Sequence, residues 1–252
     1  MFKLKSNIMK NLKFLFSVLL LSSITVSNAQ WWGGKGVKGN GDVTTITRNT
    51  GDYDGIKCGG FMDFKLVPGK EGKITIEGES NLLEHIVTEV KGGNLVVKVV
   101  KGKNLKPSNN KPLVVTIPYK DIDMVSLAGS GDVWNEGTIT GDELQTAVAG
   151  SGDLILNIDT NKAVARVAGS GDLTLKGKTE SLKATVSGSG DIHGLKLDSK
   201  NVDASIAGSG DIAVNCNGGE FKGRVAGSGD IEYRGNPSKM DTKVAGSGSI
   251  EN

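Results

Sequence analysis

Residues 167–173 read Val-Ala-Gly-Ser-Gly-Asp-Leu, and this short stretch decides the fold. Its Gly-Ser-Gly-Asp core recurs through the second half of the chain, and the last copy ends in Ser249 instead of Asp. The seven copies begin at Gly129, Gly150, Gly169, Gly188, Gly208, Gly227 and Gly246. The steps between them are 21, 19, 19, 20, 19 and 19 residues. Such regular spacing is the signature of a structural repeat.

Each copy lies in the same frame of alternating residues. In most copies the positions six and two residues before the first Gly are apolar, as at Leu182 and Val186, with a small residue such as Ala184 between them. The residue after the Asp or Ser is Val, Leu or Ile in every copy. A period of two residues is typical of a strand with one buried face. Each unit therefore reads as strand, Gly-rich corner, strand and turn.

A unit of this kind cannot bury its own apolar face, so equivalent units must stack. A length of 19 to 21 residues suits one coil. The sequence therefore predicts an all-β fold, a right-handed parallel β-helix (solenoid), with coils ~4.8 Å apart. The main alternative is a set of antiparallel hairpins forming a propeller or meander, whose blades need about 40 residues each.

The corner residues have a structural interpretation. Glycine supplies a positive φ or a close backbone approach without steric cost. An Asp can accept hydrogen bonds from local backbone N–H groups. We expect the short Ser to hydrogen-bond its equivalent in the next coil.

The N-terminus reads as a secretory signal peptide over residues 1–29. Four lysines precede a short apolar run at residues 14–26, and Ser27-Asn28-Ala29 places small residues before a cleavage point. A membrane anchor is the alternative, but the run is short. No Cys follows it that could be acylated. We expect a flexible Gly-rich lead over residues 30–42 and a single β-helix domain over 43–252.

Within that domain, residues 126–252 hold the repeats, and residues 43–125 carry strand signals without the repeat frame. Residues 73–77, 94–100 and 113–117 read as strands, and residues 87–99 as a hairpin with a Gly-Gly turn. Residues 81–85 read as one helical turn. We expect this segment to stack on the first coil and cover its open edge, which would otherwise template aggregation.

Composition excludes several classes of protein. The first 29 residues contain four lysines and no acid, so the remainder holds 26 basic and 28 acidic residues. That balance excludes a strongly basic nucleic-acid binder and a polybasic membrane binder. The 37 glycines have no collagen period. Two His and two Cys are too few for most His/Cys metal sites or for a disulfide framework.

The order of the motifs resembles a known family. Residues 48–56 (RNTGDYDGI), 74–78 (ITIEG) and 81–83 (NLL) precede residues 113–118 and the Gly-Ser-Gly-Asp repeats. This order resembles the exported family known as putative auto-transporter adhesin, head GIN domain, common in Bacteroidetes, over roughly residues 45–250. The resemblance implies a parallel β-helix-like fold, a location at the cell envelope or surface, and an adhesin-like role. It brings no catalytic residues. We expect an exported protein at the cell surface, outside the cell or in the periplasm.

Calcium binding is one sharper hypothesis. Stacking in register would place six carboxylates in a column: Asp132, Asp153, Asp172, Asp191, Asp211 and Asp230. Like charges at such spacing repel unless N–H donors or a hard cation satisfy them. One Asp per coil supplies few oxygens for a tight calcium site, so we assign no metal or cofactor.

Polysaccharide cleavage is a second hypothesis. β-Helix enzymes that cleave acidic glycans combine carboxylates with a basic residue. Arg166 and Arg224 both lie three residues before a corner, but they are three coils apart and do not converge. Gly-Ser-Gly is not the Gly-x-Ser-x-Gly nucleophile elbow. The Ser-x-x-Lys match at residues 108–111 lies in a predicted loop, and we interpret it as chance.

The remaining chemistry-bearing residues read as structural. His85 and His193 have no second His nearby in sequence to build a zinc site. Cys216 occupies an inward strand position and Cys58 lies several coils away, so we expect no disulfide. Trp31-Trp32 could stack on sugar rings but lie beside the cleavage site. The sequence therefore predicts a non-enzymatic envelope or surface protein that binds a glycan or a protein. The alternative is an enzyme or calcium-binding module that uses the Asp column.

Overall fold

The computed structural model describes residues 36–252, and strands dominate them: these residues are 67% strand and 2% helix. The helix described is α2 (Ser80–Leu83). Eighteen strands belong to one hydrogen-bonded sheet, and β1 (Val37–Lys38) and β8 (Leu105–Lys106) form a second, two-stranded sheet. No helix within residues 36–252 is long and apolar enough to cross a membrane. The expected signal peptide and Trp31-Trp32 lie outside the described residues.

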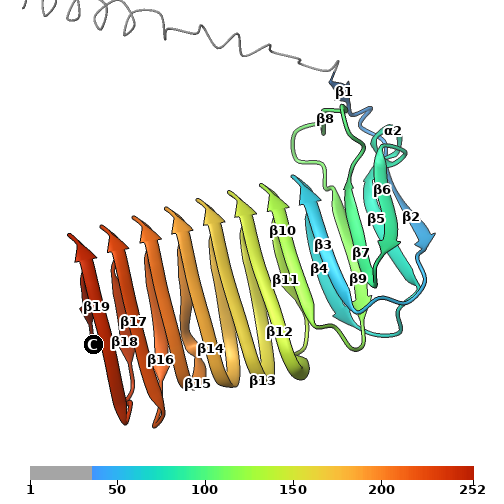
Figure 1. The fold of residues 1–252 in the computed structure, drawn as a ribbon. Coiled ribbons are helices and arrows are strands. Elements are labelled where there is room, and N and C mark those ends of the chain that lie inside the picture. Colours follow the sequence, from blue (N-terminus) through green and yellow to red (C-terminus); the bar gives the residue numbers. More distant parts are fainter. Residues whose placement is uncertain (1–35) are drawn as a thin grey trace, which may run out of the picture. The chain divides into compact units, whose positions relative to one another are not determined.

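The repeats form a β-solenoid of about seven turns of about 19 residues each, as predicted (Figure 1). Equivalent residues of successive copies pair in parallel, so Gly150 pairs with Gly169 and Gly169 with Gly188. The strands are β10 (Met124–Gly129), β11 (Val133–Asn135), β12 (Ile139–Gly150), β13 (Leu154–Gly169), β14 (Leu173–Gly188), β15 (Ile192–Gly208), β16 (Ile212–Cys216), β17 (Glu220–Gly227), β18 (Ile231–Arg234), β19 (Lys239–Gly246) and β20 (Ile250–Glu251).

The alternation of the sequence places the core inside the coils. Leu182, Ala184 and Val186 are all buried, and their neighbours along β14 face outward. The same columns are filled by Val202, Ala204 and Ile206 in the next turn. Aliphatic side chains therefore stack directly above one another along the solenoid, which removes apolar surface from water continuously.

One further corner precedes the seven copies, and it was not predicted. β3 (Gly55–Gly60) pairs in parallel with β10 and places Gly60 beside Gly129, and β4 (Asp63–Pro68) pairs with β11. Gly60-Phe61-Met62-Asp63 thus takes the place of Gly-Ser-Gly-Asp. A side chain is tolerated at Met62 because no other corner is stacked against it. The strands that pair with β3 and β4 on that side, β7 and β9, are joined by a long connection instead of a corner.

The N-terminal strands continue the stack, and the outermost of them pair in antiparallel fashion (Figure 1). β7 (Asn94–Val99) pairs in parallel with β3, and β9 (Val114–Tyr119) with β4. β6 (Ile86–Lys91), β5 (Lys73–Glu79) and β2 (Val43–Asn49) then add in antiparallel fashion. The turn joining β6 to β7 uses Gly92 and Gly93, both with positive φ, as the predicted hairpin requires. These strands lie over the open edge of the first turns.

The described part of the expected flexible lead is bonded to this N-terminal region. β1 pairs with β8, the Asn40 side chain donates to Ser80 Oγ at 2.8 Å, and the Gly41 N–H donates to Glu79 Oε1 at 2.6 Å. Residues 36–42 are therefore held by contacts with other elements, although the sequence predicts a flexible segment there. Polar partners from α2 and β5, which sequence spacing does not reveal, hold this glycine-rich segment.

Candidate functional site

The repeated Asp carboxylates are used as backbone ligands within the solenoid. Oδ1 of each corner Asp accepts a hydrogen bond from the backbone N–H of the equivalent residue one turn later. The donor and acceptor pairs are Asp132 to Asp63 (3.1 Å), Asp153 to Asp132 (3.1 Å), Asp172 to Asp153 (3.1 Å), Asp191 to Asp172 (3.0 Å), Asp211 to Asp191 (2.7 Å), Asp230 to Asp211 (2.8 Å) and Ser249 to Asp230 (2.6 Å). We call this row the Asp ladder. In the Asp ladder, the backbone N–H of the next turn gives each carboxylate the donor that a column of like charges needs.

The glycines of the corner let the backbones approach this closely. A Cβ on Gly171 would lie 2.1 Å from the carbonyl oxygen of Gly152 in the preceding turn. Gly169 has a φ of +136°, which side chains disfavour. The N–H groups of Ser170 and Gly171 both donate to the Gly150 carbonyl, at 2.8 and 2.9 Å. The corner is therefore a backbone contact surface between turns. The corner Ser hydroxyls face outward and do not form the hydrogen-bonded row that the sequence suggested, in the part of the chain described.

The two arginines considered for catalysis do not join the Asp ladder. Arg224 donates to the carbonyl and carboxylate of Asp241 on β19, with 2.6 Å to the carbonyl oxygen. Arg166 is exposed on β13, in the strand that leads into the corner. The arrangement predicted for a lyase, a carboxylate cluster beside a shared basic residue, is not formed by these residues.

One cluster at the ladder does combine different ligand types. Asp172, Asp191 and His193 offer ligand atoms that all lie within 4.8 Å of one another. His193 Nε2 lies 3.7 Å from Asp172 Oδ2, while Oδ1 of Asp172 is already bonded to the Asp191 N–H. The sequence predicts an isolated His193, because no second His lies near it in the chain. The repeat could have revealed the cluster, because His193 follows Asp191 by two residues and so faces the same side.

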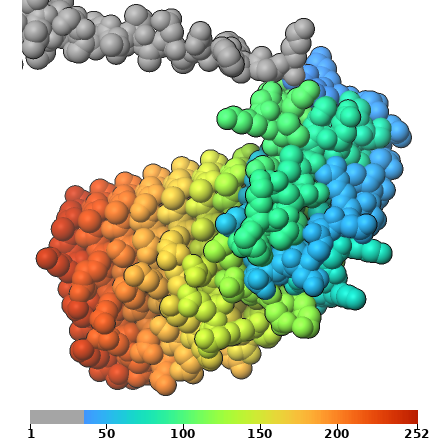
Figure 2. All heavy atoms as spheres, turned by 45° about the vertical axis from the view of Figure 1, so that its right-hand side comes forward, coloured from blue at the N-terminus to red at the C-terminus, as the bar shows by residue number. Residues whose placement is uncertain are grey.

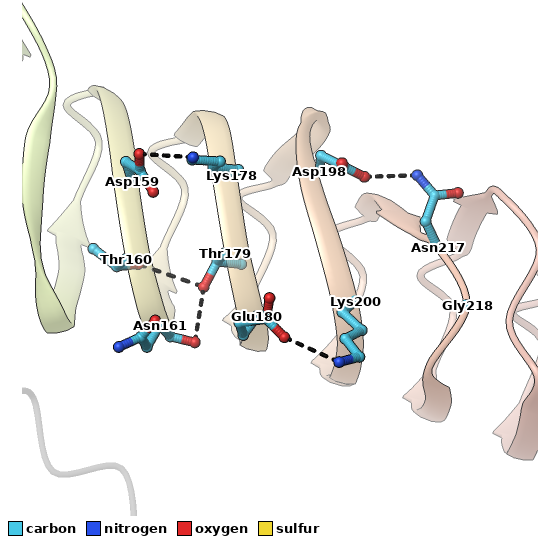
Figure 3. A pocket seen from close by; sticks show the side chains of 10 residues that line it. All are labelled: Asp159, Thr160, Asn161, Lys178, Thr179, Glu180, Asp198, Lys200, Asn217 and Gly218. Atoms are coloured by element: carbon cyan, nitrogen blue, oxygen red, sulfur yellow. Dashed lines mark hydrogen bonds and ion pairs between the residues drawn. The ribbon is translucent and has the colours of Figure 1, made fainter.

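A polar groove lies at the opposite corner of the coils, where β13, β14 and β15 bend (Figure 3). It has a volume of about 430 Å³. Its walls come from four successive turns and carry acidic, basic and amide side chains. The charged and amide lining residues are Asp159, Asn161, Lys178, Glu180, Asp198, Lys200 and Asn217. We call this the corner groove.

Pairs between turns hold the side chains of the corner groove in place (Figure 3). Lys178 Nζ lies 3.1 Å from Asp159 Oδ2, and Lys200 Nζ lies 3.3 Å from Glu180 Oε2. Asn217 donates to Asp198 Oδ1 at 2.6 Å. Each carboxylate keeps a second oxygen and each ammonium keeps further N–H groups. The groove therefore offers donors and acceptors side by side to a polar ligand.

Buried hydroxyls lie under the corner groove. Thr160 and Thr179 stack in register and are 5% and 6% exposed, and Ser199 continues the column. The Thr160 hydroxyl donates to Thr179 Oγ1 at 3.4 Å, and Thr179 bonds to the Ser181 carbonyl at 3.2 Å. These bonds satisfy the hydroxyls inside the coil and fix the bend that shapes the groove.

The other residues singled out from the sequence have structural roles. The Ser108 N–H and hydroxyl donate to Glu79 at 2.8 and 2.6 Å, so the Ser-x-x-Lys match forms a clamp on a carboxylate. His85 lies 3.6 Å from Glu84 at the end of α2. Cys58 and Cys216 are both buried and free. Burial raises the pKa of both thiols.

Comparison with known families gives one match that covers most of the chain. The family model described as "Putative auto-transporter adhesin, head GIN domain" matches residues 52–237. No curated protein matches the sequence significantly.

Solved structures share the fold. A "putative adhesin" from Bacteroides fragilis superposes with a TM-score of 0.78 at 24% identity, and covers 86% of this chain and 99% of its own. A "putative lipid binding protein" from Parabacteroides distasonis gives 0.72 at 26% identity, with 86% and 99% coverage. A "putative adhesin" from Parabacteroides merdae gives 0.66 at 22% identity, with 86% and 98% coverage.

Proposed function

The chain belongs to the "Putative auto-transporter adhesin, head GIN domain" family, and on that premise we propose that it is an exported, non-enzymatic binding protein of the cell envelope or surface. In this proposal it displays the repetitive face of a solenoid to a glycan or a protein partner. The matched family and the adhesin names of the structural neighbours support a role in adhesion.

The observation that carries the proposal is the corner groove. Its paired side chains are exposed at their ends and anchored by neighbours from other turns, as with Lys178 and Asp159. Fixed donors and acceptors lose little entropy when a ligand binds. Mixed charge and amides suit the hydroxyl groups of a glycan better than an acyl chain, which needs an apolar pocket. We therefore favour a glycan over a lipid as the ligand of the groove.

The Asp ladder supports a structural role for the repeated carboxylates. An acid or base in catalysis must have an oxygen free to reach its substrate. Oδ1 of each ladder residue is bonded to the next turn, so only Oδ2 is left for a substrate, and neither Arg166 nor Arg224 joins it there. In the proposed function these carboxylates hold the coils together, and binding belongs to the other corner.

Surface exposure is the first part of the test. Native cells are treated with protease, or with antibody to the chain, before and after the outer membrane is opened. Reactivity on intact cells supports display at the surface. Protection until the membrane is opened would rule out a surface adhesin and leave a role in the periplasm.

The groove is tested by glycan binding with paired variants. Lys178→Ala and Lys200→Ala each remove a groove cation whose side chain is more than half exposed, so the fold should tolerate them. Lys65→Ala removes an ion pair of similar length, 2.7 Å to Glu136, near the N-terminal strands. On a glycan array, the groove variants should lose about tenfold or more in affinity for any glycan that binds the wild type. The Lys65 variant should retain it. Equal losses in all three would refute the groove as the site.

A further inference from the structure

The last turn of the solenoid presents an open edge. β19 pairs with β17 and β20 with β18, and neither pairs with another strand among residues 36–252. Every residue of β19 is exposed. Met240 and Val244 are 47% and 42% exposed, although Phe221 and Val225, beside them in the same columns, are buried. This turn forms the outer end of the stack (Figure 2). Two of the core columns therefore end at the molecular surface.

The backbone of β19 is set to pair with another strand. In a parallel ladder, alternate residues direct their N–H and C=O groups to opposite neighbours. The Gln145 N–H donates back to the Asp123 carbonyl of the preceding turn, and Asp241 occupies the Gln145 column in the last turn. Asp241 and Lys243 therefore bond back into the stack. Met240, Thr242 and Val244 direct their backbone groups outward.

We propose that this edge pairs with the same edge of a second copy, in an antiparallel contact centred on Thr242. In that register Met240 lies opposite Val244 of the second copy, and Asp241 lies opposite Lys243 of the second copy. Each pair occurs twice because of the symmetry. Opposite residues of an antiparallel pair share a face, so the apolar pair lies inward and the charged pair outward. Moving the centre to Asp241 opposes Asp241 to itself, and moving it to Lys243 opposes Lys243 to itself. Of these three registers, charge favours the one centred on Thr242.

The other open strand, β20, fits the same symmetry axis. A Cβ on Gly223 would lie 3.0 Å from Ile250 Cδ1, so Ile250 faces the column that holds Gly223 and Thr242 across the core. A two-fold axis beside Thr242, midway between the two β19 strands and perpendicular to their sheet, therefore passes near Ile250 and brings it to its own copy. Ile250 is half-buried in one chain and would become covered. Both open strands are completed by one contact.

The contact closes after two copies. A two-fold contact uses the same surface on both partners, so it does not propagate. The other end of the solenoid is already covered by β2, β5 and β6. The inferred assembly is a tail-to-tail homodimer in which the two solenoids form one continuous stack.

Charge reversal tests the contact. The chain is purified after export, and its mass in solution is measured by analytical ultracentrifugation over about 1 to 100 μM, a range typical for protein contacts of modest affinity. The wild type should dimerise. Lys243→Asp opposes like charges twice, and so does Asp241→Lys, so each variant should raise the dimer dissociation constant by about tenfold or more. Mixing the two variants restores both opposite-charge pairs and should give a heterodimer.

Lys183→Asp is the matched control, because Lys183 is exposed in the same column as Asp241 in the middle of the stack. It should dimerise like the wild type. Thermal melting shows whether Asp241→Lys, which also loses the contact with Arg224, is folded. A wild type that stays monomeric overturns the proposal. So does a dimer that survives Lys243→Asp, or a mixture of the two folded variants that fails to associate.

Discussion

The backbone N–H of Asp211 donates a 2.7 Å hydrogen bond to Oδ1 of Asp191, one turn earlier in the solenoid. The same contact recurs at every corner from Asp63 to Ser249. A negative oxygen that accepts an N–H forms a stronger bond than a neutral acceptor does. The repeat therefore conserves a residue that is both short enough for the corner and charged. The acceptor, and not the charge alone, is what joins the turns.

Removing one acceptor should weaken the stack. Asp191→Ala leaves the Asp211 N–H without its partner, and we expect a loss of about 1 kcal/mol in the free energy of unfolding, because the site is partly open to water. Asp191→Asn keeps an oxygen at the same place and removes a like charge from the column. It should stay within about 0.5 kcal/mol of the wild type. Urea denaturation at pH 7 measures both. Equal losses in the two variants would show that the charge matters and the acceptor does not.

The glycine at the third corner position should be irreplaceable. In Gly171→Ala, the new methyl group would lie 2.1 Å from the Gly152 carbonyl oxygen, and backbone on both sides leaves no room to move. We expect a loss of about 3 kcal/mol or more, as for severe overpacking. Ser170→Ala, at the exposed neighbouring position, is the control and should change stability by less than about 0.5 kcal/mol. Thermal melting measures the stability of both variants. A Gly171→Ala protein as stable as the control would contradict the close stacking of the backbones.

The sequence predicted those parts of the fold in which a physical constraint repeats. Glycine at the corner and alternation in the strands are required in every turn, so they recur with a readable period. The corner at Gly60–Asp63 escaped detection because Phe61 and Met62 replace the Ser and the second Gly of the repeat. A glycine is required at the position of Met62 only where another corner is stacked against it. The bonded lead escaped for a different reason. Gly41 contacts Glu79 across 38 residues, and no local pattern records that contact.

The corner groove was not predicted, because its residues have no common motif. Asp159, Lys178 and Asp198 occupy one column in three successive turns, but their charges alternate. A search for repeats looks for the same residue at equivalent positions. Ion pairs between turns instead place residues of opposite charge at those positions. The cluster at His193 was within reach of the sequence, because the repeat fixes which residues stack beside Asp172 and Asp191.

The two thiols should be inert in the folded protein. Cys58 and Cys216 are 2% and 0% exposed, and burial raises the pKa of each thiol, so little thiolate forms at pH 8. An aromatic disulfide reagent should therefore react with neither cysteine in the native chain and with both after unfolding in guanidinium. The rate should follow the unfolding transition measured by circular dichroism. Rapid reaction of one thiol under native conditions would place that cysteine outside the core.

The Glu79 carboxylate should make the N-terminal region sensitive to acid. Its oxygens accept hydrogen bonds from the Ser108 hydroxyl, the Ser108 N–H and the Gly41 N–H. These bonds lower the pKa of Glu79, with the Ser108 hydroxyl as the largest cause. A lowered pKa means that the folded state favours the charged form. Its contribution to stability is therefore present above the pKa of the unfolded chain, about 4.3, and is lost as pH falls through the folded value.

Glu79→Gln tests this dependence. At pH 7 the variant should melt at a lower temperature than the wild type, and the difference should shrink as the pH falls towards 3, because the wild-type carboxyl becomes neutral as well. Residues 36–42 should also be cleaved faster by protease in the variant, since Gly41 loses a charged acceptor. Glu77→Gln, at an exposed position of the same strand, is the control. Its free energy of unfolding should lie within about 0.5 kcal/mol of the wild-type value. A difference between wild type and Glu79→Gln that grows with acid would reverse the sign of the linkage and contradict the clamp.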